Sequence, residues 1–117
     1  MKRENSTKLL AKKFVIQKIN KKYKDDYRSL IKGLGSMIIQ NGLYGTLVFL
    51  KAKNKDHHKA VFNDIEQYLK EKGLFKGEDL LTFLENTEEL STIQEKVLEF
   101  TNWYRRYVDI FIQTGGE

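Results

Sequence analysis

Apolar residues recur along most of this chain at intervals of three and four positions, the spacing that places side chains on one face of an α-helix. The pattern is clearest near the C-terminal end, at Ile93, Val97, Phe100, Tyr104, Val108 and Phe111. We expect these residues to form the buried stripe of one long helix. Asn86 with Glu89, or Thr92 with Glu95, provides a capping-box start for that helix, and Gly115-Gly116 provides an end.

The remaining apolar segments also favour helices over strands. A first helix is expected from about Ser6 to Tyr23, because no helix-breaking residue interrupts it. Apolar positions then define a second helix (Tyr27, Leu30, Ile31, Leu34, Ile38), a third (Leu43, Leu47, Leu50), a fourth (Val61, Ile65, Tyr68, Leu69) and a short fifth (Leu80, Leu81, Phe83, Leu84). The fourth helix is expected to begin at Asn54 or Asp56 as N-cap and to end at Gly73. The pattern therefore predicts an all-α protein: a compact bundle of five to six helices, with no sheet, in a single domain covering residues 1–117.

Asn41-Gly42 is the one local signal that conflicts with this prediction, because Asn-Gly between apolar runs is typical of a β-hairpin. The flanking residues do not alternate between apolar and polar, and no further strand is present to extend a two-stranded hairpin. We therefore expect a corner between two buried helices, with Gly42 in the left-handed αL conformation that glycine adopts at little cost.

The stretch from Gly33 to Leu50 carries no charge and has 18 residues, just enough to cross a bilayer as a helix. Eight of those residues are glycine or polar, however, whereas a membrane span is predominantly apolar. No apolar segment of a signal peptide follows the basic N-terminus. We therefore expect a cytoplasmic protein without a membrane partner.

Charge is distributed unevenly along the chain. Residues 1–59 contain 15 Lys and Arg against 4 Asp and Glu, a balance of +11, whereas residues 60–117 contain 6 against 12, a balance of −6. A chain with one basic half commonly binds a polyanion through it, while the acidic half is available to a protein neighbour, including the basic end of another copy. A lysine-rich surface that is merely solvated explains the same composition.

Residues suited to catalysis or to metal binding are scarce. The chain has no cysteine, and its two histidines, His57 and His58, are adjacent, so on a helix they point about 100° apart and are expected to be solvated surface residues. No G-x-S-x-G, P-loop or complete G-x-G-x-x-G motif is present. The sequence predicts no enzyme activity, no metal site and no cofactor.

Two stretches carry a resemblance to a known family. Leu34–Leu43 and Thr46–Lys53 are similar to the run L-P-S-L-I-x-x-N-G-L-x-x-T-L-A-F-x-K-x-K of the small helical subunit of type III-B CRISPR RNA-targeting (Cmr) complexes. Asn102–Tyr107 resembles the W-L-K-R-F/Y run in that family's last helix. The chain departs from the pattern at Gly35, where proline is expected, and at Val48, where alanine is usual.

The resemblance implies a non-catalytic structural subunit, present in more than one copy, that lines the inner side of the ribonucleoprotein filament near the guide RNA and its paired target. Its partners would be the other complex subunits, copies of itself, and both RNAs through their phosphate backbones. For these phosphate contacts we expect Lys12, Lys13, Lys21, Lys22, Lys51, Lys53, Arg105 and Arg106. Two alternatives stay open: a freestanding basic helical domain that binds nucleic acid, and a protein-interaction adaptor whose lysines only confer solubility.

Overall fold

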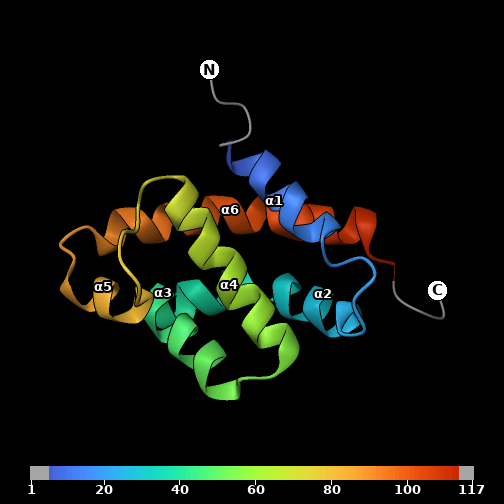
Figure 1. Ribbon diagram of the computed structural model, residues 1–117, viewed down its shortest axis with the longest axis horizontal. Coiled ribbons are helices and arrows are strands. Elements are labelled where there is room, and N and C mark those ends of the chain that lie inside the picture. Colours follow the sequence, from blue (N-terminus) through green and yellow to red (C-terminus); the bar gives the residue numbers. More distant parts are fainter. Residues whose placement is uncertain (1–5, 114–117) are drawn as a thin grey trace.

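Six helices account for most of the chain in the computed structural model, which describes residues 6–113 (Figure 1). They are α1 Thr7–Ile16, α2 Lys24–Lys32, α3 Leu34–Lys53, α4 Asp56–Glu71, α5 Leu80–Asn86 and α6 Leu90–Phe111. No strand is present within the described range. The prediction of an all-α fold of five to six helices without a sheet is confirmed.

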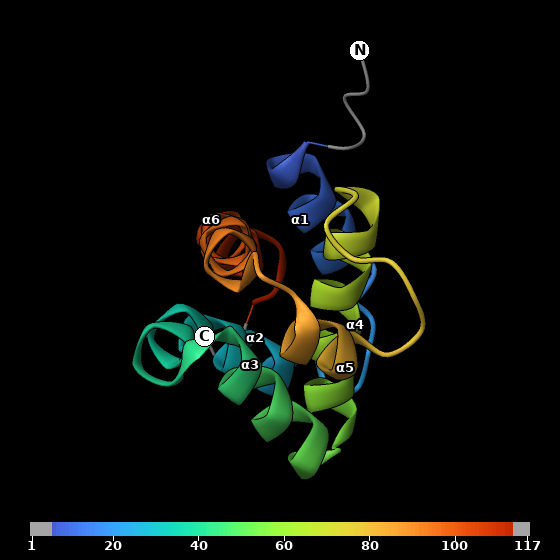
Figure 2. The same cartoon turned by 90° about the vertical axis from the view of Figure 1, so that its left-hand side faces the viewer.

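The long helix α6 organises the other elements. It lies along the longest dimension of a body measuring 45 × 37 × 24 Å and is seen nearly end-on in Figure 2. Helix α1 packs along α6, while α2 and α3 pack against both α6 and α4. The short α5 contacts α3 at the end of the molecule far from the last turn of α6 (Figure 1). The helices thus enclose one shared hydrophobic core.

The predicted stripe on α6 forms the centre of that core. Ile93, Val97, Phe100, Tyr104 and Val108 are all buried. The aromatic ring of Phe100 stacks on Tyr68 of α4 at 4.5 Å and meets Phe14 of α1 edge-on at 6.0 Å. The sixth predicted member, Phe111, is 36% exposed and is the last residue of the helix. The prediction is therefore confirmed for five of six positions.

The corner at Gly42 is confirmed, but its backbone conformation differs from the prediction. The bend lies inside α3, where Gly42 has φ 79° and ψ 161°. The αL region requires ψ near +47°, and the observed combination is essentially restricted to glycine. The bend frees the backbone N–H of Leu43, which donates a hydrogen bond of 2.8 Å to the side-chain oxygen of Gln94 on α6. A contact with a distant helix therefore completes the corner.

The first helix is shorter than predicted. Helix α1 begins as expected after Ser6, whose hydroxyl oxygen accepts a hydrogen bond from the N–H of Leu9, but it ends at Ile16 instead of continuing to Tyr23. Residues 17–23 form turns instead. The amine of Lys18 folds back to donate to the carbonyl oxygen of Phe14 at 3.1 Å, satisfying one of the carbonyls that a helix end leaves unpaired.

Helix ends elsewhere follow the prediction at one position and depart from it at others. Gly73, at φ 72°, ends α4 as predicted, and the N–H of Leu74 donates to the carbonyl of Leu69 at 2.8 Å, as in a Schellman motif. Helix α4 starts after Lys55, without a side-chain cap, because Asn54 instead closes α3 at φ 59°.

Neither predicted capping box forms at the start of α6. The helix begins after Glu89 without a side-chain hydrogen bond to its first turn. Asn86 closes α5 instead. Gly115-Gly116, predicted to end the helix, lie outside the described residues, and α6 ends at Phe111.

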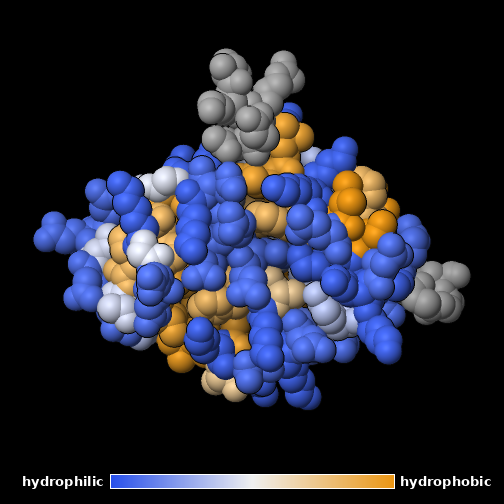
Figure 3. All heavy atoms as spheres, in the orientation of Figure 1, coloured by the Kyte–Doolittle hydropathy of each residue, from blue (hydrophilic) through white to orange (hydrophobic). Residues whose placement is uncertain are grey.

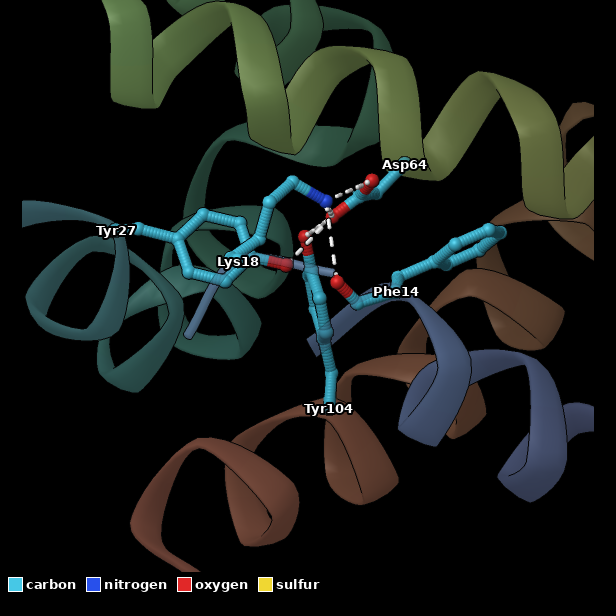
Figure 4. A network of polar contacts seen from close by, with 5 residues as sticks. All are labelled: Phe14, Lys18, Tyr27, Asp64 and Tyr104. Atoms are coloured by element: carbon cyan, nitrogen blue, oxygen red, sulfur yellow. Dashed lines mark hydrogen bonds and ion pairs between the residues drawn. The ribbon is translucent and has the colours of Figure 1, made fainter. Parts of the chain in front are cut away.

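A network of polar side chains lies inside the core (Figure 4). The carboxylate of Asp64 on α4 accepts hydrogen bonds from the amine of Lys18 at 2.9 and 3.1 Å, and from the hydroxyls of Tyr27 and Tyr104 at 2.6 Å each. Asp64 is 5% exposed and Lys18 is 7% exposed. Burial, and then the neighbouring Asp64 carboxylate, raise the pKa of both tyrosines well above the usual value near 10. The network connects α2, α4, α6 and the segment after α1.

Within residues 6–113, no individual helix combines the length and apolar character needed to cross a membrane. Helices α2 and α3 meet that criterion only when joined, and they are bent by 74° relative to each other.

Candidate nucleic-acid interface

All eight cationic residues predicted to contact RNA are exposed, on α1, on α3, on α6 and in the segment between α1 and α2. Among residues 6–113, none of the eight forms an ion pair with a carboxylate. The ion-paired cations of the described chain are other residues: Lys18, Lys24, Arg28 and Lys32. The predicted residues therefore present charges that the described part of the fold does not neutralise through ion pairs.

These residues do not form one patch. Lys12 and Lys13 lie on α1, which packs along α6, the helix that carries Arg105 and Arg106. Lys51 and Lys53, by contrast, lie at the C-terminal end of α3. This end of the helix is at the bottom of the molecule in Figures 1 and 2, whereas α1 is at the top. Lys21 and Lys22 lie in the connection from α1 to α2. The structure therefore separates an α1–α6 group from an α3–α4 corner group.

The two adjacent arginines of α6 differ in their surroundings. The guanidinium of Arg106 lies over the ring of Trp103 at 5.4 Å. Arg105 is instead close to Asp109, where a hydrogen bond from Lys32, with the charges of Lys32, Arg28 and Arg105, lowers the pKa of the Asp109 carboxyl. Arg106 is therefore the arginine that belongs to the aromatic surface beside α1.

Three aromatic side chains on one face of α6 form what we call the aromatic row: Trp103, Tyr107 and Phe111. Their ring centres are 6.1 Å apart at each step, with interplanar angles of 25° and 30°. Two lysines of α1 lie over the ends of the row, Lys8 over Trp103 at 5.9 Å and Lys12 over Phe111 at 5.8 Å. The sequence analysis did not identify this row. A signal was present, because the three aromatic residues recur every four positions, and Trp103 and Tyr107 each come directly before a core residue, Tyr104 or Val108.

The corner group has aromatic partners too. The amine of Lys51 lies over the ring of Phe62 at 4.8 Å, and the amine of Lys53 lies over Phe49 at 5.7 Å. A recess of about 220 Å³ adjoins this corner, and no acidic residue lines it. Its lining consists of Leu50, Lys51, Asn54, Lys59, Phe62 and Asn63. The corner is thus a second basic surface, with a smaller aromatic component than the α1–α6 group.

Acidic residues gather at the other end of α6 and around α5. A wider recess of about 670 Å³ there is lined by four carboxylates, those of Glu66, Glu78, Asp79 and Glu85. On the face shown in Figure 3, hydrophilic residues cover most of the surface and apolar residues form separate patches. Lys51 and Phe62 of the corner also line this recess, where hydrogen bonds from Thr82, helped by the charge of Lys51, lower the pKa of the Asp79 carboxyl. The acidic surface therefore adjoins the corner group, whereas the α1–α6 group lies apart from it.

The histidine pair is not the solvated surface pair that the sequence predicted. His58 is 7% exposed, its ring meets Phe49 edge-on at 5.8 Å, and its Nδ1 atom has no hydrogen-bond partner among the described residues. Burial, helped by the nearby His57 and by the charges of Lys53 and Lys55, lowers the pKa of His58. Within the part of the chain described, no three His, Cys, Asp or Glu side chains are placed to hold a metal ion.

Comparison with known proteins gives a consistent result. A family model described as "CRISPR-associated protein (Cas_Cmr5)" matches residues 5–111. A protein of Thermotoga maritima called "CRISPR system Cmr subunit Cmr5" is 36% identical over 88% of this chain and 78% of its own length. A protein of the same name from Thermus thermophilus is 29% identical over 75% of this chain and 76% of its own length. No solved structure gave a significant match.

Proposed function

The chain belongs to the Cmr5 family of CRISPR-associated proteins, and on this basis we propose that it is a non-catalytic, RNA-binding small subunit of a Cmr effector complex. In this role it contributes helical surface to the ribonucleoprotein and contacts the guide RNA and its paired target. It works in the cytoplasm, beside other subunits of the complex. The proposal agrees with the near absence of residues suited to catalysis.

One observation supports the RNA-binding part of the proposal. The eight predicted cations are exposed and form no ion pairs within residues 6–113, where the ion-paired cations are Lys18, Lys24, Arg28 and Lys32. Six of the eight are lysines, which act on phosphate as point charges and carry no base specificity. Sequence discrimination in such a complex comes from guide–target pairing, so contacts of this kind are sufficient.

The separation of charge supports a place inside a filament of repeated subunits. Basic surfaces lie at two different sides of the molecule, and carboxylates gather around α5. The acidic recess adjoins the corner at Lys51, whereas the α1–α6 group lies apart from it. One copy can therefore present its acidic surface to a basic surface of the next and still leave the α1–α6 group for RNA. We propose that this arrangement lines the inner side of the filament.

Charge reversal tests the RNA contacts separately at the two basic surfaces. We expect Lys12→Glu with Lys13→Glu, and separately Lys51→Glu with Lys53→Glu, to weaken RNA binding by the assembled complex. The loss should be equal for unrelated target sequences, and each phosphate contact removed should lower the slope of log affinity against log salt by about one unit. Filter binding at several salt concentrations measures both quantities.

Lys76→Glu with Lys96→Glu is the matched control, because both residues are exposed and lie outside the two basic groups. Circular dichroism checks that helicity is unchanged in every variant. If neither predicted pair affects RNA binding more than the control pair does, the lysines are only a solvated surface, and any role in the complex rests on protein contacts alone.

The non-catalytic part of the proposal needs its own test. The purified chain, incubated with RNA or DNA in the presence and absence of divalent metal ions, should leave both intact. Cleavage that persists through rigorous purification and is lost in a His57, His58 or Asp25-Asp26 variant would contradict the proposal.

A further inference from the structure

We propose that the aromatic row on α6 is a binding site for single-stranded RNA, in which successive bases stack on Trp103, Tyr107 and Phe111. The cationic groups of Lys8, Lys12 and Arg106 lie over Trp103 and Phe111 in the free chain, and on binding they turn aside to hold the phosphates on either side. The inference rests on the proposed function as an RNA-binding subunit, and it adds a site that contacts bases as well as phosphates.

The spacing of the rings points to an extended strand. The ring centres are 6.1 Å apart at each step and the rings are within 30° of parallel. Neighbouring phosphates on one strand of a duplex advance by about 3.4 Å, so consecutive bases of a duplex cannot occupy consecutive rings. In addition, bases inside a helix are already stacked on each other. Unpaired RNA has both the reach and the free base faces that this site requires.

The row is firmly held and still accessible. Trp103 and Tyr107 pack against the hydrophobic core with one part of each ring and remain partly exposed, while Phe111 is 36% exposed. The neighbouring Ile110 is 59% exposed and extends the apolar surface. Because α6 is a long helix anchored by its buried stripe, the rings keep their order and spacing without a ligand. A preformed platform of this kind loses little side-chain freedom on binding.

The charges around the row match a polyanion. The amine of Lys8 and the guanidinium of Arg106 lie over Trp103, and the amine of Lys12 lies over Phe111. Asp109, the carboxylate on α6 nearest in sequence to the row, is already ion-paired with Arg28 at 2.9 Å and with Lys32 at 2.8 Å, so its charge is balanced by those residues. Glu99, four residues before Trp103, is exposed, and its negative charge marks the end of the basic surface on that side of the row.

An acidic peptide would satisfy the three cations but would leave the aromatic faces without a planar partner. RNA satisfies both, because each nucleotide carries one phosphate and one flat base. Stacking is also tolerant of sequence, since every base has a π-face, and this agrees with the sequence-independent contacts of the proposed function.

The chain offers a direct reporter, because Trp103 is its single tryptophan. We would titrate the full chain at low salt with a short oligouridylate, which stays extended because uridine stacks weakly on itself. The same titration uses an abasic oligonucleotide of equal length and charge. Oligouridylate should quench the tryptophan fluorescence and bind more tightly, whereas the abasic strand should bind more weakly and leave the fluorescence nearly unchanged.

Substitutions within the row then test the individual rings. Tyr107→Leu and Phe111→Leu should each weaken oligouridylate binding by roughly 5-fold to 100-fold, with little change for the abasic strand. Phe83→Leu is the matched control, since Phe83 is a partly exposed aromatic residue on α5, where its ring meets Phe75 at 5.2 Å. Circular dichroism verifies folding, and Tyr107→Met replaces Tyr107→Leu if the latter does not fold.

The outcomes separate this inference from the proposed function. Equal affinity for both strands, without quenching, would overturn base stacking while leaving phosphate binding intact. Binding of polyglutamate as tight as that of oligouridylate would show that the row serves an acidic protein partner instead. Absence of RNA binding by both the isolated chain and the assembled complex would contradict the proposed function, and the inference with it.

Discussion

Lys12 and Lys18 lie six positions apart in the sequence, yet they belong to regions of opposite character. Lys18 is 7% exposed, and its amine donates to the Phe14 carbonyl and to both oxygens of Asp64. Lys12 is exposed and lies over the ring of Phe111, without an ion-pair partner among the described residues. One lysine completes the interior, while the other leaves its charge available to a ligand.

The difference shows that the role of a lysine depends on what surrounds its amine. Inside the core, a charge is tolerated only when it is paired and hydrogen-bonded, so the Asp64 network is complete, and removing one member harms the others. On the surface, water already solvates the charge, so removing it costs little stability. Substitutions in the Asp64 network should therefore lower the free energy of unfolding much more than a substitution of Lys12 does. For RNA binding we expect the reverse, with the larger loss at Lys12.

The largest effect is expected from Asp64→Ala. The substitution leaves the Lys18 charge buried without its partner and two tyrosine hydroxyls without their acceptor, so the free energy of unfolding should fall by about 3–5 kcal/mol. Urea denaturation followed by circular dichroism measures it. Lys12→Ala serves as the control.

A companion variant tests whether charge pairing is the reason for that loss. Lys18→Met combined with Asp64→Leu removes both charges and should recover part of the stability. If the double variant is no more stable than Asp64→Ala, packing around Asp64 matters more than its charge, and the contrast with Lys12 loses its electrostatic basis.

A moderate effect is expected when the tyrosine hydroxyls are removed. Tyr27→Phe and Tyr104→Phe each delete one hydrogen bond of 2.6 Å to the Asp64 carboxylate and should lower the free energy of unfolding by about 1.5–3 kcal/mol. Tyr107→Phe, on the surface side of α6, should change it by less than about 0.5 kcal/mol. Equal effects at positions 104 and 107 would contradict the distinction between interior and surface.

A smaller effect is expected from His58, a buried group that forms no ion pair with a carboxylate among the described residues, although the charge of Asp26 weakly opposes the lowering of its pKa. Burial lowers the pKa of His58 in the folded state below its ordinary value near 6.5, so the unfolded chain takes up the proton at a higher pH than the folded chain does. His58 therefore favours folding above that ordinary pKa, and this contribution is lost as the pH falls through the lower folded pKa.

Thermal unfolding measured between about pH 7 and pH 5 tests this sign. The melting temperature of the unmodified chain should fall toward pH 5, and His58→Phe should reduce that dependence. A steeper dependence in His58→Phe would mean that the histidine is stabilised in its charged form.

The smallest effect on stability is expected at Lys12 itself. Lys12→Gln should change the free energy of unfolding by less than about 0.5 kcal/mol, because the amine is exposed. Its effect should appear in RNA binding, where the salt slope falls by about one unit. A loss of stability comparable to that of Tyr104→Phe would show that the contact between Lys12 and Phe111 mainly fastens α1 to α6.

The sequence by itself determined the all-helical class, the corner at Gly42 and five of the six core positions on α6. It did not determine every helix boundary, because the predicted second helix is broken at Gly33 into α2 and α3, which are bent by 74°. The features that it did determine are local: apolar spacing specifies which face of a helix is buried, and a glycine at positive φ marks where a helix bends. Residue type alone also predicted that most lysines and arginines are exposed, since these residues rarely lie in a core.

Only the tertiary structure decided which cations are available. In the sequence, Lys18 cannot be distinguished from the neighbouring lysines. Its burial depends on an ion pair with Asp64, which is 46 positions away and leaves no local signal. The same long-range packing ends α1 at Ile16, supplies Gln94 to the corner at Leu43, and places Lys8 and Lys12 over the aromatic row. Helix periodicity specifies which faces are apolar, but the partners of each side chain depend on how those faces meet, and contacts between distant segments carry no local signature.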